Sequence, residues 1–216
     1  MEVRIIKKGE RRKQELLKIA YRLFLSKGYE NTSVDDIIDE AGIAKGTYYY
    51  YFESKEQMLE EVIDMMLESE IENAKAVVTA EIPVPLKIVG IIASMRPSQD
   101  EQPIAETLHR PENIIMHEKI NRRLIERVVP LLSEVTEEGI RQGLFSCDRI
   151  PERVKVLLIL SNALFNDEGF GENDIEVFID TAEKLLGAQA GTMGFIRQLI
   201  NTQDSSEQET DNNNDS

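Results

Sequence analysis

The stretch Ala41–Phe52, AGIAKGTYYYYF, constrains the fold more than any other part of the chain. Its first residues predict a tight turn at Gly42, and the rest predict a helix of about two turns. Consecutive helical residues point about 100° apart, so four consecutive tyrosines cannot all face a core. Some phenol groups must therefore face outward. A short helix with exposed hydroxyls, Lys45 at its start and Gly46 allowing close approach suits the major groove of DNA.

The net charge of −15 is divided unevenly along the chain. Residues 1–22 carry eight basic and three acidic side chains, and residues 1–60 as a whole are neutral. Residues 61–216 hold 14 basic and 29 acidic side chains and therefore carry the whole negative excess. An acidic body repels DNA, whereas a basic arm and a neutral head can approach it.

The composition argues against several classes of protein. Cys147 is the single cysteine, which excludes an internal disulfide framework and fits a reducing cytoplasm. The two histidines, His109 and His117, do not have zinc-ligand spacing, and we expect no metal and no cofactor. No apolar run approaches the ~20 residues of a membrane span, so we expect no membrane partner and a cytoplasmic location. No catalytic set of carboxylates, nucleophile and base, or phosphate loop is evident, so we do not expect an enzyme.

Apolar residues recur at helical spacing and no β pattern occurs, which predicts an all-α fold. A stripe over residues 16–24 predicts a first helix. Ser33 followed by Asp36 is a variant of the capping box and predicts the start of a second, short helix. The tyrosine helix comes third, and Ser54 with Gln57 predicts the start of a longer fourth helix. Residues 33–51 therefore form a candidate helix, tight turn and helix.

Residues 10–60 resemble the DNA-binding head of the tetracycline-repressor (TetR) family of bacterial regulators. The resemblance rests on Ala20, Leu23-Phe24, Gly28-Tyr29, Thr32-Ser33-Val34, Ile37, the run Ala41–Phe52, Ser54-Lys55-Glu56 and Leu59. It covers about a quarter of the chain and fixes residue types over three helices and their turns. The later helices resemble the family only in number and order.

The resemblance implies a three-helix helix-turn-helix head, joined by a fourth helix to a C-terminal helical bundle. We accordingly expect a flexible basic arm over residues 1–8, a DNA-binding domain over 9–53, an effector-binding and dimerisation domain over 54–201, and a disordered acidic tail over 202–216. The implied function is a homodimeric transcription factor, usually a repressor, that a small-molecule effector releases from a palindromic operator in double-stranded DNA.

Carried over by position, the resemblance also implies the residues that contact DNA. Those that would face bases or the adjoining backbone are Lys45, Gly46, Thr47 and Tyr48. Those that would bind phosphate are Tyr49 and Tyr51, together with Thr32, Ser33 and Lys55 at the starts of helices. Within the tyrosine run, Phe52 and Tyr50 are expected to be packed. The alternative for the whole run is an aromatic core cluster.

The last two apolar stripes have two interpretations. The family places these helices in a four-helix dimer interface, which would contain Val154, Leu157, Leu158, Ser161, Phe165, Ile175, Phe178, Ile179, Ala182 and Leu186. The alternative is that both stripes form internal core. A ligand cavity would be lined by Met65, Met66, Met95, His109 and Met116, because methionine adapts to irregular apolar ligands. The alternative for each of these five residues is plain core or surface.

Two other functions are open at this point. One is a regulator that a protein partner controls and that has no ligand pocket. The other is a helical enzyme or carrier with an incidental head. A cavity of roughly several hundred Å³ between the body helices would favour a ligand, whereas a solid body would favour a protein partner.

Overall fold

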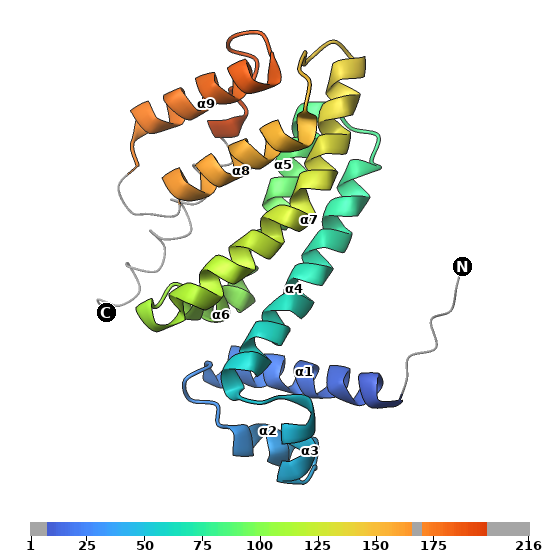
Figure 1. Cartoon of the computed structure of the whole chain (residues 1–216), viewed down its shortest axis with the longest axis vertical. Coiled ribbons are helices and arrows are strands. Elements are labelled where there is room, and N and C mark those ends of the chain that lie inside the picture. Colours follow the sequence, from blue (N-terminus) through green and yellow to red (C-terminus); the bar gives the residue numbers. More distant parts are fainter. Residues whose placement is uncertain (1–7, 166–169, 198–216) are drawn as a thin grey trace. The chain divides into compact units, whose positions relative to one another are not determined.

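The computed structural model describes residues 8–165 and 170–197, and within them the regular structure is helical with no strand (Figure 1). The all-α prediction is confirmed. The α-helices are α1 (Lys8–Lys27), α2 (Val34–Ala41), α3 (Lys45–Tyr51), α4 (Lys55–Val78), α5 (Val84–Ser94), α6 (Gln102–Leu108), α7 (Ile114–Arg141), α8 (Ile150–Phe165) and α9 (Glu172–Leu186). Short 3-10 turns lie at Gln99–Glu101 and Pro111–Asn113. The predicted arm before Lys8 and the predicted tail over 202–216 lie outside the described residues.

The chain forms two compact units. The head unit consists of Met1–Ser69 and Pro97–Arg122, and the body unit consists of Glu70–Arg96 and Arg123–Ser216. Both α4 and α7 therefore begin in the head unit and end in the body unit. Residues 97–122 group with the head by their contacts, a division that helical periodicity does not reveal. The functional boundary at residue 53 stays a prediction.

The core of the head unit forms where the predicted apolar stripes meet. Its fully buried side chains include Leu16, Ala20 and Phe24 of α1, Ile37 of α2, Tyr48 of α3, and Met58, Leu59 and Val62 of α4. Phe24 meets the ring of Tyr29 edge to face, with 5.3 Å between ring centroids. Each short helix of the head is therefore held by burial against α1 and α4 rather than by its own propensity.

Three polar contacts attach residues 97–122 to the rest of the head unit. They are the Tyr21 hydroxyl donating to the Glu101 carboxylate at 2.9 Å, the Arg110–Glu30 ion pair at 3.0 Å and the Lys119–Glu60 ion pair at 2.6 Å. Each exposed pair stabilises the fold only weakly, so their main effect is to fix how this segment lies against α1 and α4.

A buried lysine links three helices of the body unit. The Lys87 ammonium on α5 donates to the carbonyl of Val78, the last residue of α4, at 3.0 Å. It also pairs with the Glu138 carboxylate on α7 at 2.7 Å. A buried charge is costly unless it is paired and hydrogen-bonded, and both conditions are met here. Lys87 thus satisfies the end of α4 while joining α5 to α7.

The end of α9 folds back on the body unit. Gly187 ends the helix with φ of +62°, and the Ser146 N–H donates to the Leu186 carbonyl at 2.9 Å. The buried Glu183 carboxylate then accepts the N–H groups of Gly191 at 3.0 Å and Met193 at 2.9 Å. Residues 188–193 are therefore held by a carboxylate that points back from α9. No helix of the described chain has the length and apolarity that a membrane crossing requires.

Gly187→Ala should be much more destabilising than Gly191→Ala. Both glycines have positive φ, which costs a non-glycine residue about 1–2 kcal/mol. A Cβ at Gly187 would lie 2.1 Å from the backbone carbonyl oxygen of Ser146, whereas a Cβ at Gly191 meets open space. The clash should add about 1–3 kcal/mol at Gly187 alone. Urea unfolding of both variants measures the difference, and equal losses would contradict the close approach at Ser146.

Candidate functional site

The two ends of α2 set the position of α3. Ser33 Oγ accepts the N–H of Asp36 at 3.0 Å, and the Asp36 carboxylate accepts the N–H of Ser33 at 2.8 Å, so the predicted capping box is confirmed. Gly42 ends α2 with φ of +60° and donates its N–H to the Asp39 carbonyl at 3.1 Å. Only three residues separate α2 from α3, which is the spacing of a helix-turn-helix pair.

The aromatic residues of α3 divide between anchoring and exposure. Tyr48 is 0% exposed, its hydroxyl donates to the Ser54 carbonyl at 3.2 Å, and burial raises the pKa of its phenol to about 12. Phe52 is also buried, with its ring centroid 5.7 Å from that of Tyr48. By contrast, Tyr49 and Tyr50 are 49% and 80% exposed. The seven-residue α3 is therefore seated by Tyr48 and Phe52 and presents Tyr49 and Tyr50 to the outside.

Lys55, at the start of α4, is tied to the loop before α2. Its ammonium donates to the carbonyls of Tyr29 at 2.8 Å and Thr32 at 3.0 Å. It also lies 4.1 Å from the centroid of the Tyr29 ring, in reach of a cation–π interaction. Lys55 therefore joins the start of α4 to the loop between α1 and α2.

Lys45, the first residue of α3, pairs with Asp35 of α2. The ammonium and the carboxylate lie 3.0 Å apart, and both side chains are exposed, at 61% and 69%. The hydrogen bond to Asp35 and the charge of its carboxylate raise the pKa of Lys45 above its ordinary value. The cation of α3 that was predicted to face DNA thus has an internal counterion.

A family description matches this arrangement of helices. Residues 16–62 match the model of "Bacterial regulatory proteins, tetR family". The chain is 28% identical over 141 residues to the HTH-type transcriptional repressor KstR2 of Rhodococcus jostii, which covers 63% of this chain and 69% of that protein. It is 50% identical over 52 residues to KstR2 of Mycolicibacterium smegmatis. Residues 16–62 are thus a TetR-family DNA-binding domain. The chain is a DNA-binding transcriptional regulator.

The likeness is strongest in the helix-turn-helix region. The match to the Mycolicibacterium protein covers 24% of this regulator and only 25% of that relative's length. Solved structures agree over more of the chain. A transcriptional regulator from Cytophaga hutchinsonii aligns with a TM-score of 0.54 at 18% identity, over 81% of this chain and 94% of that one. A TetR regulator from Haloarcula marismortui gives 0.54 at 19% identity, over 82% and 97%. At these identities the structures show a shared fold.

Most of the residues predicted to contact DNA lie at or near the surface of the regulator. Ser33, Lys45, Gly46 and Tyr49 are exposed, and Thr47 and Tyr51 are half-buried. Their contact with DNA stays a prediction. So does that of Lys55, whose ammonium would have to exchange protein carbonyls for phosphate.

One of the predicted DNA contacts is wrong, and a second has a buried side chain. Tyr48 lies in the core of the head, so its side chain cannot face bases. Thr32 is also fully buried, and its hydroxyl donates to the Gly28 carbonyl at 2.8 Å, where it closes the loop before α2. The family pattern places both residues near DNA, but it does not distinguish side chains that support the interface from those on its surface.

Two residues of this surface were missed or misassigned. Tyr50 was expected to be packed, and its exposure shows that prediction to be wrong, whereas the burial of Phe52 is confirmed. The pairing of Asp35 with Lys45 was not predicted. The available signal was weak: two residues ten apart in the sequence, on helices that a tight turn brings together.

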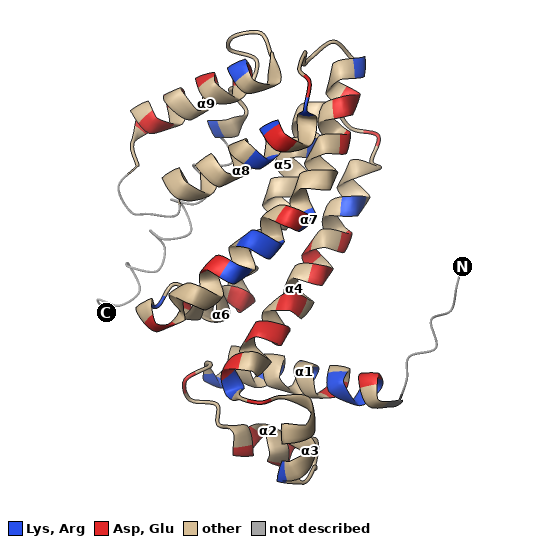
Figure 2. Cartoon of the chain, viewed as in Figure 1, with Lys and Arg blue, Asp and Glu red and all other residues tan. Residues whose placement is uncertain are grey.

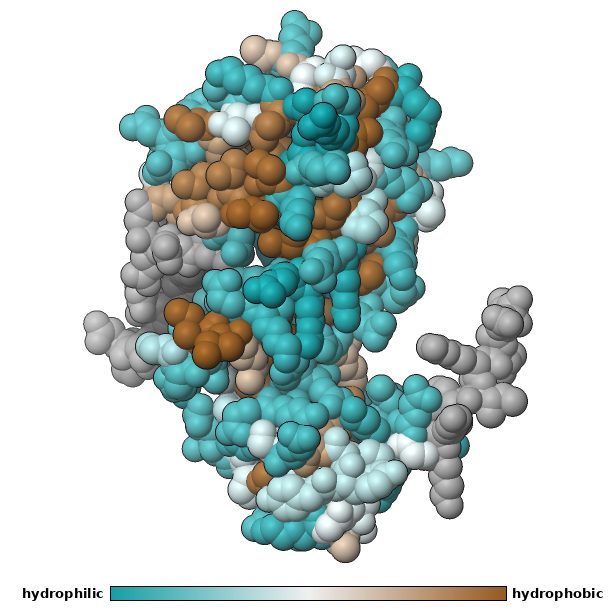
Figure 3. Space-filling view, viewed as in Figure 1, coloured by the Kyte–Doolittle hydropathy of each residue, from teal (hydrophilic) through white to brown (hydrophobic). Residues whose placement is uncertain are grey.

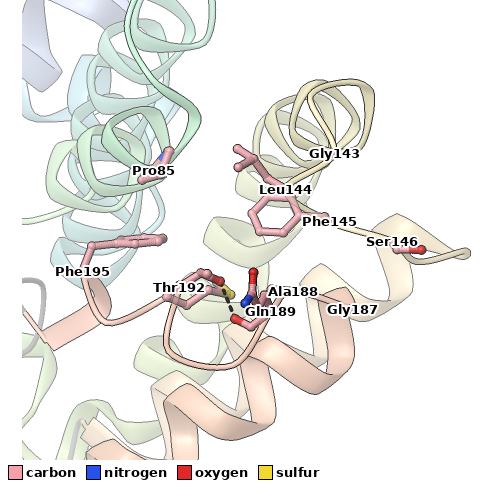
Figure 4. A pocket seen from close by; sticks show the side chains of 11 residues that line it. Pro85, Gly143, Leu144, Phe145, Ser146, Gly187, Ala188, Gln189, Thr192 and Phe195 are labelled. Carbon is pink, nitrogen blue, oxygen red and sulfur yellow. Dashed lines mark hydrogen bonds between the residues drawn. The ribbon is translucent and has the colours of Figure 1, made fainter.

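The body unit contains a pocket of about 400 Å³ at the end of α9 (Figure 4). Leu144 and Phe145 of the loop after α7 face Gln189 and Thr192 of the segment after α9, and Phe195 extends toward the space from the side. The Thr192 hydroxyl donates to the Gln189 carbonyl at 2.6 Å and closes one wall. Aromatic and aliphatic lining with a few polar groups suits a mainly apolar small molecule.

None of the residues predicted to line a ligand cavity lines this pocket. Met65, Met66, His109 and Met116 belong to the head unit, and Met95 belongs to the body unit. His109 is exposed, and its ring packs against that of His117 with 4.8 Å between centroids. Their role in ligand binding stays a prediction. The glycine-rich segment after α9 offered a signal, since such a segment can wrap an opening, but composition alone does not identify a pocket.

The predicted dimer interface is mostly wrong about its residues. The predicted residues that are buried within the body core of a single chain are Val154, Phe165, Ile175, Phe178, Ile179, Ala182 and Leu186. Leu157, Leu158 and Ser161 are half-buried. Periodicity identifies a buried stripe, but it cannot show whether the same chain or a second copy covers it. For these seven residues, the alternative of internal core is correct.

A different face of α8 is apolar and exposed, and one apolar residue of α9 is exposed as well. Val156 and Ile159 of α8 are 45% and 47% exposed, and Val177 of α9 is 64% exposed. With the exposed Ala163, the α8 residues follow a spacing of three and four, which puts them on one stripe. Figure 3 shows apolar surface gathered over α8. This outer face is a better candidate for association than the predicted stripe.

Tyr49→Phe should affect binding to DNA, whereas Tyr48→Phe should affect the stability of the head. Loss of the exposed Tyr49 hydroxyl should weaken binding to duplex DNA about five- to tenfold at low salt and leave thermal stability unchanged. Loss of the Tyr48 hydroxyl leaves the Ser54 carbonyl without that donor and should cost about 1 kcal/mol of stability. Fluorescence anisotropy with labelled duplex and thermal unfolding measure both effects. Unchanged DNA affinity of Tyr49→Phe would contradict its role in binding phosphate.

Proposed function

We propose that this regulator is a homodimeric repressor that binds a palindromic operator and leaves it when a small molecule binds the body unit. The observation that carries the proposal is the combination of a seated, outward-facing α3 in the head with an uncovered apolar stripe on α8 in the body. Repression follows the function named for the KstR2 relatives. Its place of action would be the cytoplasm.

A homodimer would bring a second α3 helix to the DNA, where it would bind the second half-site. A seven-residue helix reads few base pairs, so a single head has little specificity. Two heads related by twofold symmetry would place their α3 helices in successive major grooves about 34–36 Å apart. The outer stripe of α8 suits the association because it adds apolar surface that one chain leaves exposed.

Release would pass through helices that belong to both units. α4 and α7 each have residues in both units, so these helices are the candidates to carry a shift in the body to the head. Within the head, the Tyr21–Glu101 and Lys119–Glu60 contacts tie residues 97–122 to α1 and α4. A ligand that favours one arrangement would change DNA affinity by the usual coupling of about 1–3 kcal/mol.

A regulator controlled by a protein partner is the second candidate. The pocket at the end of α9 favours the small molecule, because its volume of about 400 Å³ falls within the range of ligand sites. An enzyme or carrier is disfavoured, because the family model that matches residues 16–62 describes regulatory proteins.

Ile159→Glu should give a monomer with poor operator binding. A carboxylate on the outer stripe of α8 would have to be buried without a partner in the dimer. Sequences selected from random duplex DNA by the wild-type protein should contain two inverted half-sites, and the variant should bind them at least about a hundredfold more weakly. Light scattering gives the mass of each protein.

The matched control for that variant is Leu86→Glu. Leu86 of α5 is 52% exposed and lies outside α8 and α9. It should keep the wild-type mass and the wild-type affinity for the selected DNA. If the Ile159→Glu protein were still a dimer, the outer stripe of α8 would not be the dimer interface. Selected sequences with a single half-site would contradict a palindromic operator.

Gln189→Trp should block the pocket. The exposed Gln189 side chain lines the pocket, and an indole there would occupy part of the space. With 1-anilinonaphthalene-8-sulfonate as an apolar probe, the variant should bind about tenfold more weakly than the wild type, while its affinity for operator DNA stays the same. Gln102→Trp, an exposed site in the head unit, serves as control. Equal dye binding by both variants would contradict a ligand site here.

A further inference from the structure

Carboxylates neutralise most of the cations on the described surface of the head. The ion pairs of α1 and α3 are Arg11–Glu15 at 3.8 Å, Arg12–Glu15 at 2.8 Å, Lys13–Glu61 at 2.5 Å, Arg22–Glu40 at 3.6 Å, Lys27–Asp36 at 2.9 Å and Lys45–Asp35 at 3.0 Å. Figure 2 shows acidic residues beside basic ones along this part of the chain. The head therefore offers DNA less positive charge than its lysine and arginine content suggests.

The Lys45–Asp35 pair differs from the others in its place. It joins the first residue of α3 to the first turn of α2, so it lies in the helix-turn-helix itself. The other basic residues in that set belong to α1. Lys45 is therefore the cation in the set that sits on the helix proposed to enter the groove, and Asp35 is its counterion.

We propose that Asp35 is a specificity-determining residue that acts through Lys45: by holding the ammonium, it suppresses binding to DNA of arbitrary sequence. Only a sequence whose base contacts outweigh the loss of the pair would then bind tightly. The inference rests on the proposed DNA-reading role of α3 and adds a residue that discriminates between operator and bulk DNA.

The exchange of partners explains the effect. Binding to DNA of any sequence depends on cations that neutralise phosphates and release counterions. Lys45 can neutralise a phosphate only by leaving Asp35, so the first contact removes one ion pair for each one formed. Because both side chains are exposed, the internal pair is weak enough to open when an operator offers a better partner.

Asp35→Asn tests this role, with Asp39→Asn as the matched control. Asp39 is exposed on the same helix, carries the same charge and is not the partner of Lys45. The two variants thus change the net charge equally and differ in whether they free the ammonium. Lys45→Gln and the double variant Asp35→Asn/Lys45→Gln complete a cycle that isolates the coupling.

Binding to a mixed-sequence duplex is measured by anisotropy over a range of salt concentrations, and thermal unfolding checks that each variant is folded. Asp35→Asn should bind mixed-sequence DNA about three- to tenfold more tightly than the wild type. The slope of log affinity against log salt should steepen by about 0.9, as expected for one more neutralised phosphate. The affinity for the selected operator DNA should rise less, so the ratio of operator affinity to mixed-sequence affinity should fall. Asp39→Asn should change affinity by less than about twofold, with an unchanged slope.

Three results would overturn the role of Asp35. Equal gains in affinity from Asp35→Asn and Asp39→Asn would be explained by the change in net charge alone. If Asp35→Asn still raised the affinity for mixed-sequence DNA in the Lys45→Gln background, Asp35 would not act through Lys45. Weaker binding by Asp35→Asn would mean that the carboxylate itself contacts DNA, for example the amino group of cytosine. Failure of the proposed function would look different, because selection from random duplex DNA by the wild type would then enrich no operator.

Discussion

Burial of Tyr48 and Phe52 is the interaction on which the DNA-binding end of the regulator depends. α3 has seven residues, and an isolated helix of that length is not stable in water. The two buried rings hold it against the head core, and the Tyr48 hydroxyl bonds to the Ser54 carbonyl beyond its end. Because helical neighbours point in different directions, anchoring these two rings leaves Tyr49 and Tyr50 outside. The burial of Tyr48 and Phe52 therefore also determines which residues of α3 are exposed.

The distribution of charge along the chain also bears on DNA binding. An acidic protein must approach a polyanion, and the division of charge along the sequence allows the head to do so. Residues 1–60 are neutral in sum, and the structure adds that carboxylates on α2 and α4 lie beside individual cations of this region. Such a surface is suited to a protein that must ignore most DNA.

α8 of the body unit is apolar on two sides. Val154 and Phe165 face the core of their own chain, and Val156 and Ile159 face outward on the same helix. A helix that is apolar around most of its circumference normally has a partner on each side. The internal partner is the body core, and the proposed external one is a second copy of the chain.

The sequence by itself determined the helices, the capping box at Ser33, the turn at Gly42 and the family of the head. These depend on periodicity and on hydrogen bonds between residues a few positions apart, which a single chain displays directly. Only the tertiary structure decided that Thr32 and Tyr48 are internal, that Asp35 meets Lys45, and which face of α8 is free. The physical reason is that exposure and ion pairing depend on which distant segments cover a residue, and local pattern carries no information about that choice.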